Sequence, residues 1–217
     1  IVPGSVTQMQ HLTGQQAGKR SLKNLALSYW AKSAQNAHEA WQAVQHQYQN
    51  ADNMTDRLAA LHIAIEYHFE KAQDLIQNFY QRFQSEALVI DKWFAIQASR
   101  SSGKPTGMQA NVRALMAHAG FHLPNPNRWR SWIFSVCNAT PHQFHQNDGS
   151  GYRFWAEQVL EINEKNPQVA ARLARTCENW RIYTEPYQTL MRQALEHVAS
   201  ARDLSDDVRE IVTKALR

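Results

Sequence analysis

Three polar side chains near residue 170 have the spacing of one helix face. Gln168, Arg172 and Arg175 follow each other at i, i+4 and i+7, and Val169 and Leu173 fall on the opposite, apolar side. Each of the three is a long hydrogen-bond donor, so the stripe could bind the oxygen atoms of a ligand. A solvated helix surface is the alternative, and composition alone favours it.

A second basic spot lies at the start of another predicted helix, where Arg128 and Arg130 stand beside Trp129 and Trp132. Over the whole chain, 23 Lys and Arg residues exceed 19 Asp and Glu residues, which gives a net charge of +4 and a pI near 9.1. These basic residues are spread almost evenly, whereas nucleic-acid-binding domains cluster them. The charge therefore predicts weak attraction to anions and no nucleic-acid partner.

Ten histidines raise the question of a metal site. His38 and Glu39 begin like the zinc-protease motif H-E-x-x-H, but Gln42 stands where the second histidine belongs. The remaining clusters lack a third ligand or do not converge on one side of a helix. These clusters are His62, Glu66 and His68, and the pair His142 and His145. The sequence therefore predicts no metal ligand in this chain.

Two cysteines, Cys137 and Cys177, are too few for a disulfide framework, and they have neither C-x-x-C spacing nor a partner histidine. Cys177 continues the apolar stripe of Val169 and Leu173, which predicts a small buried hydrophobe. A reducing compartment, the cytoplasm, is the expected location. No run approaches the roughly 18 uninterrupted apolar residues of a membrane helix, so no membrane partner is expected.

The elements that must position these side chains have a helical pattern throughout. With 43% hydrophobic and 10% aromatic residues, and only eight Gly and seven Pro, the chain has the composition of a globular protein. Apolar residues recur at helical spacing, and the stripe of Leu22, Leu25, Ala26, Tyr29 and Trp30 is expected to bury one face of its helix. No strand-type alternation is sustained, and even the apolar run 87–90 leads into a helical pattern.

Local signals mark where several helices begin. Asn125-Pro126, Thr140-Pro141 and Asn166-Pro167 each place a capping residue before a proline at the first helical position, and Ser205 precedes two carboxylates. The block Asp148-Gly149-Ser150-Gly151-Tyr152 lacks the Lys-Ser/Thr of a phosphate-binding loop and is interpreted as a turn and helix start. The pattern predicts an all-α fold of stacked helical hairpins that form a superhelical array of the HEAT or armadillo kind.

The blocks Asn125–Ser131 and Asp148–Tyr152 occur together with segments 18–24, 52–56, 91–94, 144–145 and 166–173. In this order and spacing they closely resemble the C-terminal domain of bacterial aminopeptidase N. The resemblance runs from about residue 17 to the end. We therefore expect one helical domain over residues 17–217, with the small polar stretch 99–107 as a loop within it. Residues 1–16 carry no recognisable block.

This resemblance implies a fragment of a zinc aminopeptidase of the gluzincin class, whose H-E-x-x-H motif lies in an earlier domain that the chain lacks. The parent enzyme would remove N-terminal amino acids from peptides. The fragment would be a non-catalytic domain that covers the catalytic domain of the same polypeptide, leaves a restricted route to the zinc and helps to bind peptide substrates. Such enclosure keeps folded proteins out and strengthens polar contacts to the substrate.

By the same resemblance, Arg130, Gln168 and Arg172 face the catalytic cleft, where they are expected to contact substrate or to pack against the catalytic domain. Their chemistry suits a peptide, because arginine forks bind carbonyl and carboxylate oxygens. The alternative is an independent helical-repeat scaffold that binds a protein or peptide partner along its concave face. Separation from the rest of the enzyme is also expected to expose an apolar face, and so to favour self-association.

Overall fold

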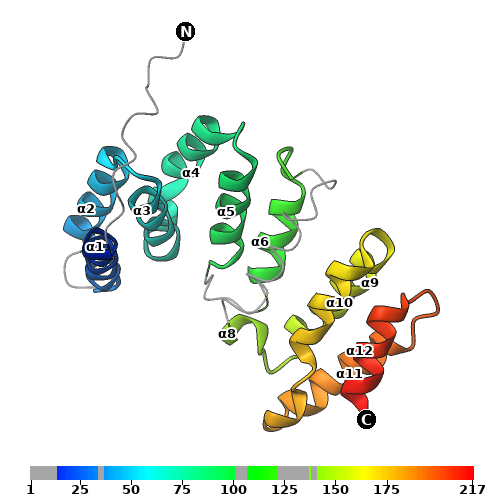
Figure 1. The fold of residues 1–217 in the computed structure, drawn as a ribbon. Coiled ribbons are helices and arrows are strands. Elements are labelled where there is room, and N and C mark those ends of the chain that lie inside the picture. Colours follow the sequence, from blue (N-terminus) through cyan, green and yellow to red (C-terminus); the bar gives the residue numbers. More distant parts are fainter. Residues whose placement is uncertain (1–13, 34–36, 101–106, 122–136, 138–140) are drawn as a thin grey trace. The chain divides into compact units, whose positions relative to one another are not determined.

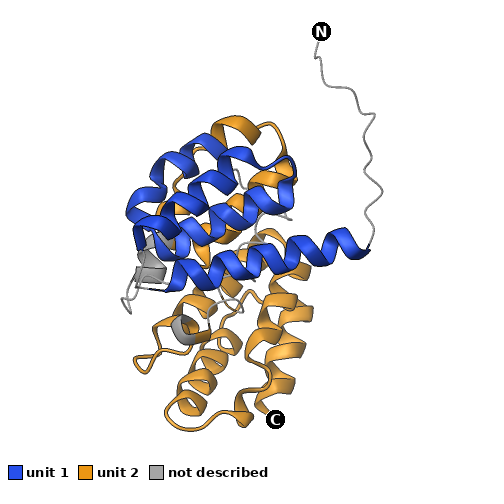
Figure 2. Ribbon diagram, turned by 90° about the vertical axis from the view of Figure 1, so that its left-hand side faces the viewer, with its two compact units in different colours: residues 1–79 blue, residues 80–217 orange. Residues whose placement is uncertain are grey.

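Helices make up the regular secondary structure of the part of the chain that is described (Figure 1). The computed structural model describes residues 14–33, 37–100, 107–121, 137 and 141–217, and within these ranges there is no β-strand. None of the described helices is long and apolar enough to span a membrane. The chain divides into two compact units, residues 1–79 and residues 80–217, which Figure 2 colours separately. The predicted all-α fold of helical hairpins is confirmed.

Unit 1 is built from α1 (Gly14–Lys32), α2 (Ala37–Asn50), α3 (Met54–Tyr67) and most of α4 (Phe69–Phe83). Asn53 begins α3, because its Oδ1 accepts the backbone N–H of Asp56 at 2.9 Å. Tyr48 connects α2 to α4 through its hydroxyl, which donates to the carbonyl of Leu75 at 3.2 Å. The apolar core of the unit includes Val44, Ala60, Leu61, Ala64, Ile65 and Phe79.

The apolar stripe of α1 is exposed, which corrects the expectation that it buries one face of the helix. Leu22, Leu25 and Tyr29 all lie in solvent, and Leu27 and Ala31 are the buried apolar residues of α1. The physical reason is that Lys23 and Asn24 of α1 donate hydrogen bonds to the carboxylate of Asp56 in α3. These bonds fix the rotation of α1 so that its apolar stripe faces away from α2 and α3.

Unit 2 begins with the end of α4 and continues through α5 (Ala87–Ala98), α6 (Gly107–Met116) and the short α8 (Pro141–Phe144). Because α5 starts at Ala87, the run 87–90 is helical as predicted. In the second half, α9 (Ser150–Lys165) and α10 (Pro167–Ala174) form one hairpin. After the 3-10 turns η2 (Arg175–Cys177) and η3 (Trp180–Ile182), α11 (Tyr187–Ala199) and α12 (Asp206–Leu216) form the next hairpin.

These two hairpins stack as repeats. Contacts join α9 to α11 and α10 to α12, so this part of unit 2 has an α9/α11 layer and an α10/α12 layer (Figure 1). The buried amide of Asn163 holds the second hairpin to the first: its Nδ2 donates to the Asp203 carbonyl at 2.8 Å and its Oδ1 accepts the Ser205 N–H at 3.0 Å. The start of α12 is thereby fixed against α9.

The predicted helix starts that lie in the described residues are correct. Asn166 accepts the backbone N–H of Val169 at 3.1 Å, with Pro167 as the first residue of α10. Ser205 accepts the N–H of Val208 at 3.4 Å at the start of α12, and α8 begins at Pro141. The predicted start at 125–126 falls outside the described residues.

Candidate functional site

The candidate binding face lies on α10. Gln168 and Arg172 are both exposed, while Ala170, Leu173 and Ala174 are buried against α9 and α12. The i, i+4 spacing therefore places the two predicted side chains on the solvent side of one helix, as the periodicity indicated. The third predicted residue, Arg130, falls outside the described residues, so the structure does not place it beside the other two.

Burial of the opposite side of α10 holds this face in position. Trp155 of α9 is fully buried, and its indole N–H donates to the Leu173 carbonyl at 2.9 Å. A bulky side chain thus fills the space between the two helices and satisfies a carbonyl in the last turn of α10. Because the helix is anchored along its apolar side, the polar side chains on its other side project from a rigid base.

The polar face continues past the end of α10 into a charged groove of about 220 Å³. Arg175, the third member of the predicted stripe, lines this groove and pairs with Glu178 at 3.2 Å. Three cationic and two anionic side chains lie in the lining, so the groove has a small excess of positive charge. The lining residues are Arg175, Glu178, Arg181, Glu210, Ile211, Lys214 and Ala215.

Hydrogen bonds to one carbonyl fix the far wall of the charged groove. The indole of Trp180 and the guanidinium of Arg181 both donate to the carbonyl of Ala215, at 2.9 and 2.6 Å. That guanidinium also lies over the Trp180 ring, 4.3 Å from its centroid. Two donors therefore satisfy a carbonyl in the last turn of α12 and orient a cation at the groove.

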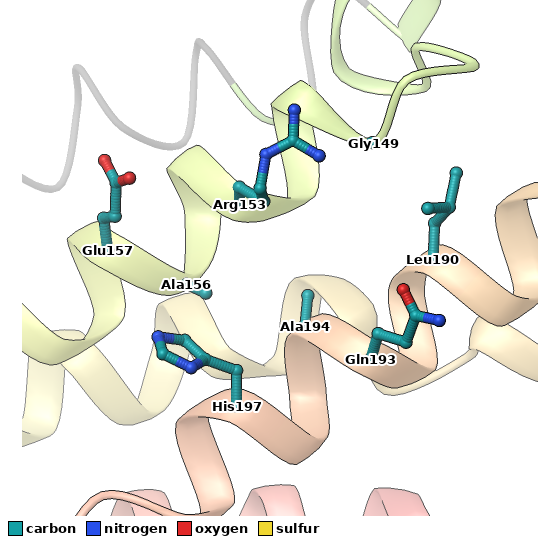
Figure 3. A pocket seen from close by; sticks show the side chains of 8 residues that line it. All are labelled: Gly149, Arg153, Ala156, Glu157, Leu190, Gln193, Ala194 and His197. Carbon is teal, nitrogen blue, oxygen red and sulfur yellow. The ribbon is translucent and has the colours of Figure 1, made fainter.

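A second groove, of about 330 Å³, lies between α9 and α11 (Figure 3). Ala156, Leu190 and Ala194 supply apolar lining, and four polar side chains surround it. Gln168 and Arg172 do not line it, because they belong to α10 in the other layer. Sequence reasoning missed this groove, since its two walls are about forty residues apart in the chain. The polar residues that line it are Arg153, Glu157, Gln193 and His197.

The block at 148–152 is a turn and helix start, as interpreted from the sequence. The Oδ1 atom of Asp148 accepts the Ser150 N–H at 2.9 Å, and Gly149 has a φ of +69°, which favours glycine. A Cβ atom at Gly151 would lie 2.0 Å from the Phe144 carbonyl oxygen. The two glycines thus let α9 start in close contact with α8, and the block needs no bound phosphate to explain it.

Two of the histidines that motivated the metal question, His145 and His38, have side-chain hydrogen-bond partners. The ring of His145 is hydrogen-bonded to the Tyr152 hydroxyl at 2.7 Å, and burial lowers the pKa of this histidine. His38 lies 3.1 Å from the amide of Gln42, the residue that replaces the second histidine of H-E-x-x-H. Across the described part of the chain, His, Cys, Asp and Glu side chains form no group of three or more that could hold a metal ion.

Both cysteines are buried and unbridged, which confirms the prediction that Cys177 is a small buried hydrophobe. Burial raises the pKa of the Cys137 thiol to about 12. Burial also raises the pKa of Cys177 well above its ordinary value, and the nearby Cys137 adds to this effect. A thiol that stays protonated is a poor nucleophile, so neither residue is suited to covalent chemistry.

A buried polar cluster in unit 1 is the feature that sequence reasoning missed most clearly. Asp56 is only 3% exposed, and its carboxylate accepts hydrogen bonds from Lys23, from Asn24 at 3.0 Å and from Asn53 at 3.1 Å. Gln47 of α2 donates to the Asn24 side chain at 2.8 Å. The cluster joins segments 18–24 and 52–56, two of the blocks that carried the resemblance. Both segments belong to the blocks that carried the resemblance, and this was the signal from which a link between them could have been predicted.

The structure thus defines an all-helical repeat domain with a polar candidate binding face on α10. The chain belongs to the family described as "Domain of unknown function (DUF3458_C) ARM repeats", which matches residues 5–217. The family description agrees with the predicted armadillo-like array, and with the stacking of the α9–α10 and α11–α12 hairpins.

Its relatives in sequence are bacterial aminopeptidases. The chain is 39% identical over 206 residues to aminopeptidase N of Haemophilus influenzae, and 38% identical over 198 residues to aminopeptidase N of Escherichia coli. These matches cover 95% and 91% of this chain, but 23% and 22% of the relatives. The resemblance to the C-terminal domain of aminopeptidase N is confirmed, and the chain spans less than a quarter of the length of these relatives.

A solved structure supports the same relationship. Legionella pneumophila aminopeptidase A, in complex with aspartic acid, matches this chain with a TM-score of 0.85 and 28% identity. The match covers 100% of this chain and 25% of the Legionella chain. The fold described above is therefore one also found within a larger aminopeptidase.

Proposed function

We propose that this chain is the C-terminal ARM-repeat domain of a cytoplasmic zinc aminopeptidase that removes N-terminal amino acids from peptides. The domain itself is non-catalytic. It covers the catalytic domain of the same polypeptide, restricts the access of substrates and contributes contacts to bound peptides. The observation that carries the proposal is the 34–39% identity to three bacterial aminopeptidases N over more than nine tenths of this chain.

Zinc belongs to the parent enzyme in this proposal, and residues outside these 217 would hold it. The described residues do not fit such a role, because they contain no group of side chains that could hold a metal ion. Zinc would supply the Lewis acid for peptide hydrolysis in the catalytic domain. This chain contributes binding and exclusion: exposed polar side chains on α10 contact the peptide, and the helical domain keeps larger substrates out.

The α10 face is suited to peptide recognition for two reasons. Arg172 offers a planar fork of donors that matches a carboxylate or a backbone carbonyl, and Gln168 offers one donor group and one acceptor on the same side of the helix. By resemblance, Arg130 joins them in the site. The positive excess in the adjoining groove favours the carboxylate end of a short peptide.

The assignment of catalysis to another domain can be tested by assaying hydrolysis of an amino-acid arylamide in the presence of zinc. We expect turnover by the full-length protein and none by the 217-residue chain. Turnover by the chain alone would overturn the assignment of the chemistry to another domain. Specific binding of peptides at micromolar affinity by the isolated chain, together with an inactive full-length protein, would instead identify an independent scaffold.

Replacing Arg172 with alanine in the full-length enzyme is expected to raise KM for peptides. A charge-assisted hydrogen bond that is desolvated in the complex contributes about 1.5–3 kcal/mol, so KM should rise roughly tenfold or more. The matched control is Arg192→Ala, an exposed arginine on α11 that pairs with Glu196 at 2.8 Å. Steady-state kinetics over several peptide lengths provide the measurement. An Arg172→Ala enzyme that matches the control at every length would remove this residue from the site.

A further inference from the structure

The first described helix, α1, carries an apolar face that no described residue covers. Leu22, Leu25 and Tyr29 are 69%, 55% and 70% exposed, and their i, i+3, i+7 spacing places them on one side of α1. Trp30, which is 43% exposed, lies beside them. In Figure 2, α1 is the blue helix that follows the grey N-terminal trace. Large apolar side chains at helical spacing in solvent are typical of an interface rather than of a free surface.

Gly18 extends this face by one turn, because it precedes Leu22 by four residues. A Cβ atom added at Gly18 would meet nothing within 4 Å, so neighbouring atoms of this chain do not require a glycine here. Glycine in the interior of a helix is nevertheless less favourable than alanine. A small residue at a helix surface allows a second helix to approach closely. The glycine therefore points to a packed partner in the same direction as the exposed leucines.

The charge of α1 indicates what kind of partner fits. The helix contains Lys19, Arg20, Lys23 and Lys32, and it has no Asp or Glu. By helical periodicity the exposed Lys19 and Lys32 flank the apolar face, whereas Lys23 bonds to Asp56 of α3. A partner that buries the apolar face would place its own flanks beside Lys19 and Lys32. Electrostatic complementarity therefore favours a helix with aliphatic side chains along its centre and acidic residues at its edges.

Repeat arrays explain why such a face exists. In these proteins each repeat buries its apolar side against its neighbours, and a terminal repeat needs a polar outer face. The outer face of α1 is apolar, so α1 has the character of an internal repeat. More than three quarters of the length of the relatives lies outside the matched region, which leaves ample chain to supply a neighbour.

We infer that the face formed by Gly18, Leu22, Leu25 and Tyr29 packs against an amphipathic helix with acidic flanks, from a part of the full-length polypeptide outside these 217 residues. This inference rests on the proposed function, because it assigns the partner to the parent chain. It adds to that function the surface of α1 by which this domain packs against the rest of the enzyme.

Hydrogen exchange of the α1 amides, measured in the 217-residue chain and in the full-length protein, tests the inference. We expect exchange to be roughly tenfold slower or more in the full-length protein, because a covering helix suppresses local opening of α1. Leu25→Asp is expected to abolish that protection while changing exchange in the isolated chain little. The matched control is Leu88→Asp on α5, where the leucine is 72% exposed. This control should leave α1 protection intact.

Gly18→Ala gives a second, independent readout. It is expected to raise the midpoint of thermal unfolding of the isolated chain, since alanine favours the helix. In the full-length protein it should lower the midpoint, since the added methyl group occupies the contact. A higher midpoint in both proteins would overturn the inference, as would equal α1 exchange rates in both.

Other occupants of the face would be recognised by separate measurements. A dimer of the isolated chain in sedimentation, dissociated by Leu25→Asp, would assign the face to a second copy and overturn the inference. Faster α1 exchange after removal of residues 1–13 would assign it to this chain's own N-terminal segment, with the same consequence. The proposed function is assayed separately: a full-length protein without aminopeptidase activity but with a protected α1 would refute the function and leave the interface standing.

Discussion

Gly151→Ala is expected to lower the free energy of unfolding by about 3 kcal/mol, near the upper end of the usual cost of overpacking. The new Cβ would lie 2.0 Å from the carbonyl oxygen of Phe144, 2.8 Å from its carbonyl carbon and 3.0 Å from its Cα. All three are backbone atoms, so no side-chain rotation can relieve the clash. Phe144 is itself 1% exposed, and therefore α8 has little room to move away.

The intrinsic preference of alanine for helix acts in the opposite direction. Alanine is favoured over glycine by about 1 kcal/mol in a helix interior, and Gly151, the second residue of α9, would gain at most that amount. The measured loss of unfolding free energy is therefore the cost of the clash minus this gain in helix preference. The matched control is Gly18→Ala in α1, where a Cβ meets nothing within 4 Å. The same substitution should there stabilise the isolated chain slightly.

Urea unfolding of the two variants and the parent chain, followed by circular dichroism, measures these differences. Because the chain has two compact units, the transition assigned to unit 2 is the one that Gly151→Ala should shift. If the two glycine variants had equal stability, the close approach of α8 to α9 would not exist in solution.

Asp56→Asn is expected to cost about 3 kcal/mol in the unfolding free energy of unit 1. The carboxylate accepts hydrogen bonds from three side-chain donors, on Lys23, Asn24 and Asn53, in a buried position. An asparagine of the same shape removes the negative charge and turns an NH₂ group toward one of those donors. Two donors then face each other at a largely buried position, and the hydrogen bonds that join α1 to α3 are weakened.

The effect of Asp56 should depend on pH with a definite sign. Burial raises the pKa of this carboxyl, but hydrogen bonds from Lys23, Asn53 and Asn24 more than offset burial and hold the pKa below its ordinary value of 3.8. A group whose pKa is lower in the folded state stabilises the fold above its unfolded pKa. That contribution is present in full at neutral pH and is lost as the pH falls through the lower, folded pKa.

The parent chain and Asp56→Asn should therefore differ most in stability at about pH 7 and least at pH values below the lowered, folded pKa of Asp56. Urea midpoints across this range provide the measurement, and Asp74→Asn is the matched control because Asp74 is exposed on α4. A stability gap that stays constant down to the lowest pH would show that the charge of Asp56 plays no part. If Asp74→Asn lowered the urea midpoint as much as Asp56→Asn, the buried polar cluster would have no special role in stability.

Helix starts could be predicted from the sequence because their physics is local. A capping side chain, a proline at the first position and a carboxylate near the helix dipole all act within one turn. Asn166 and Ser205 therefore mark α10 and α12 without knowledge of any distant residue. The same holds for the placement of Gln168 and Arg172 on one exposed face, which depends only on the helical repeat.

The rotation of α1 could not be predicted in this way. Its strongest apolar stripe, at Leu22, Leu25 and Tyr29, suggested a buried face, yet the buried side is set by Lys23 and Asn24. Those two residues bond to Asp56, more than thirty positions away in the chain. Periodicity reports which residues share a face, but the identity of the neighbouring surface decides which face is covered.

The sequence by itself determined that the described part of the chain is built from helices, where several of them begin, and which polar side chains share the outer face of α10. Each of these depends on residues within a turn or two. Tertiary structure alone decided how the hairpins stack, that the α9/α11 layer carries a groove, that Asp56 is the centre of a buried polar cluster, and that the apolar side of α1 is left open. These features join residues far apart in the chain, whose contacts exist only after the helices have packed.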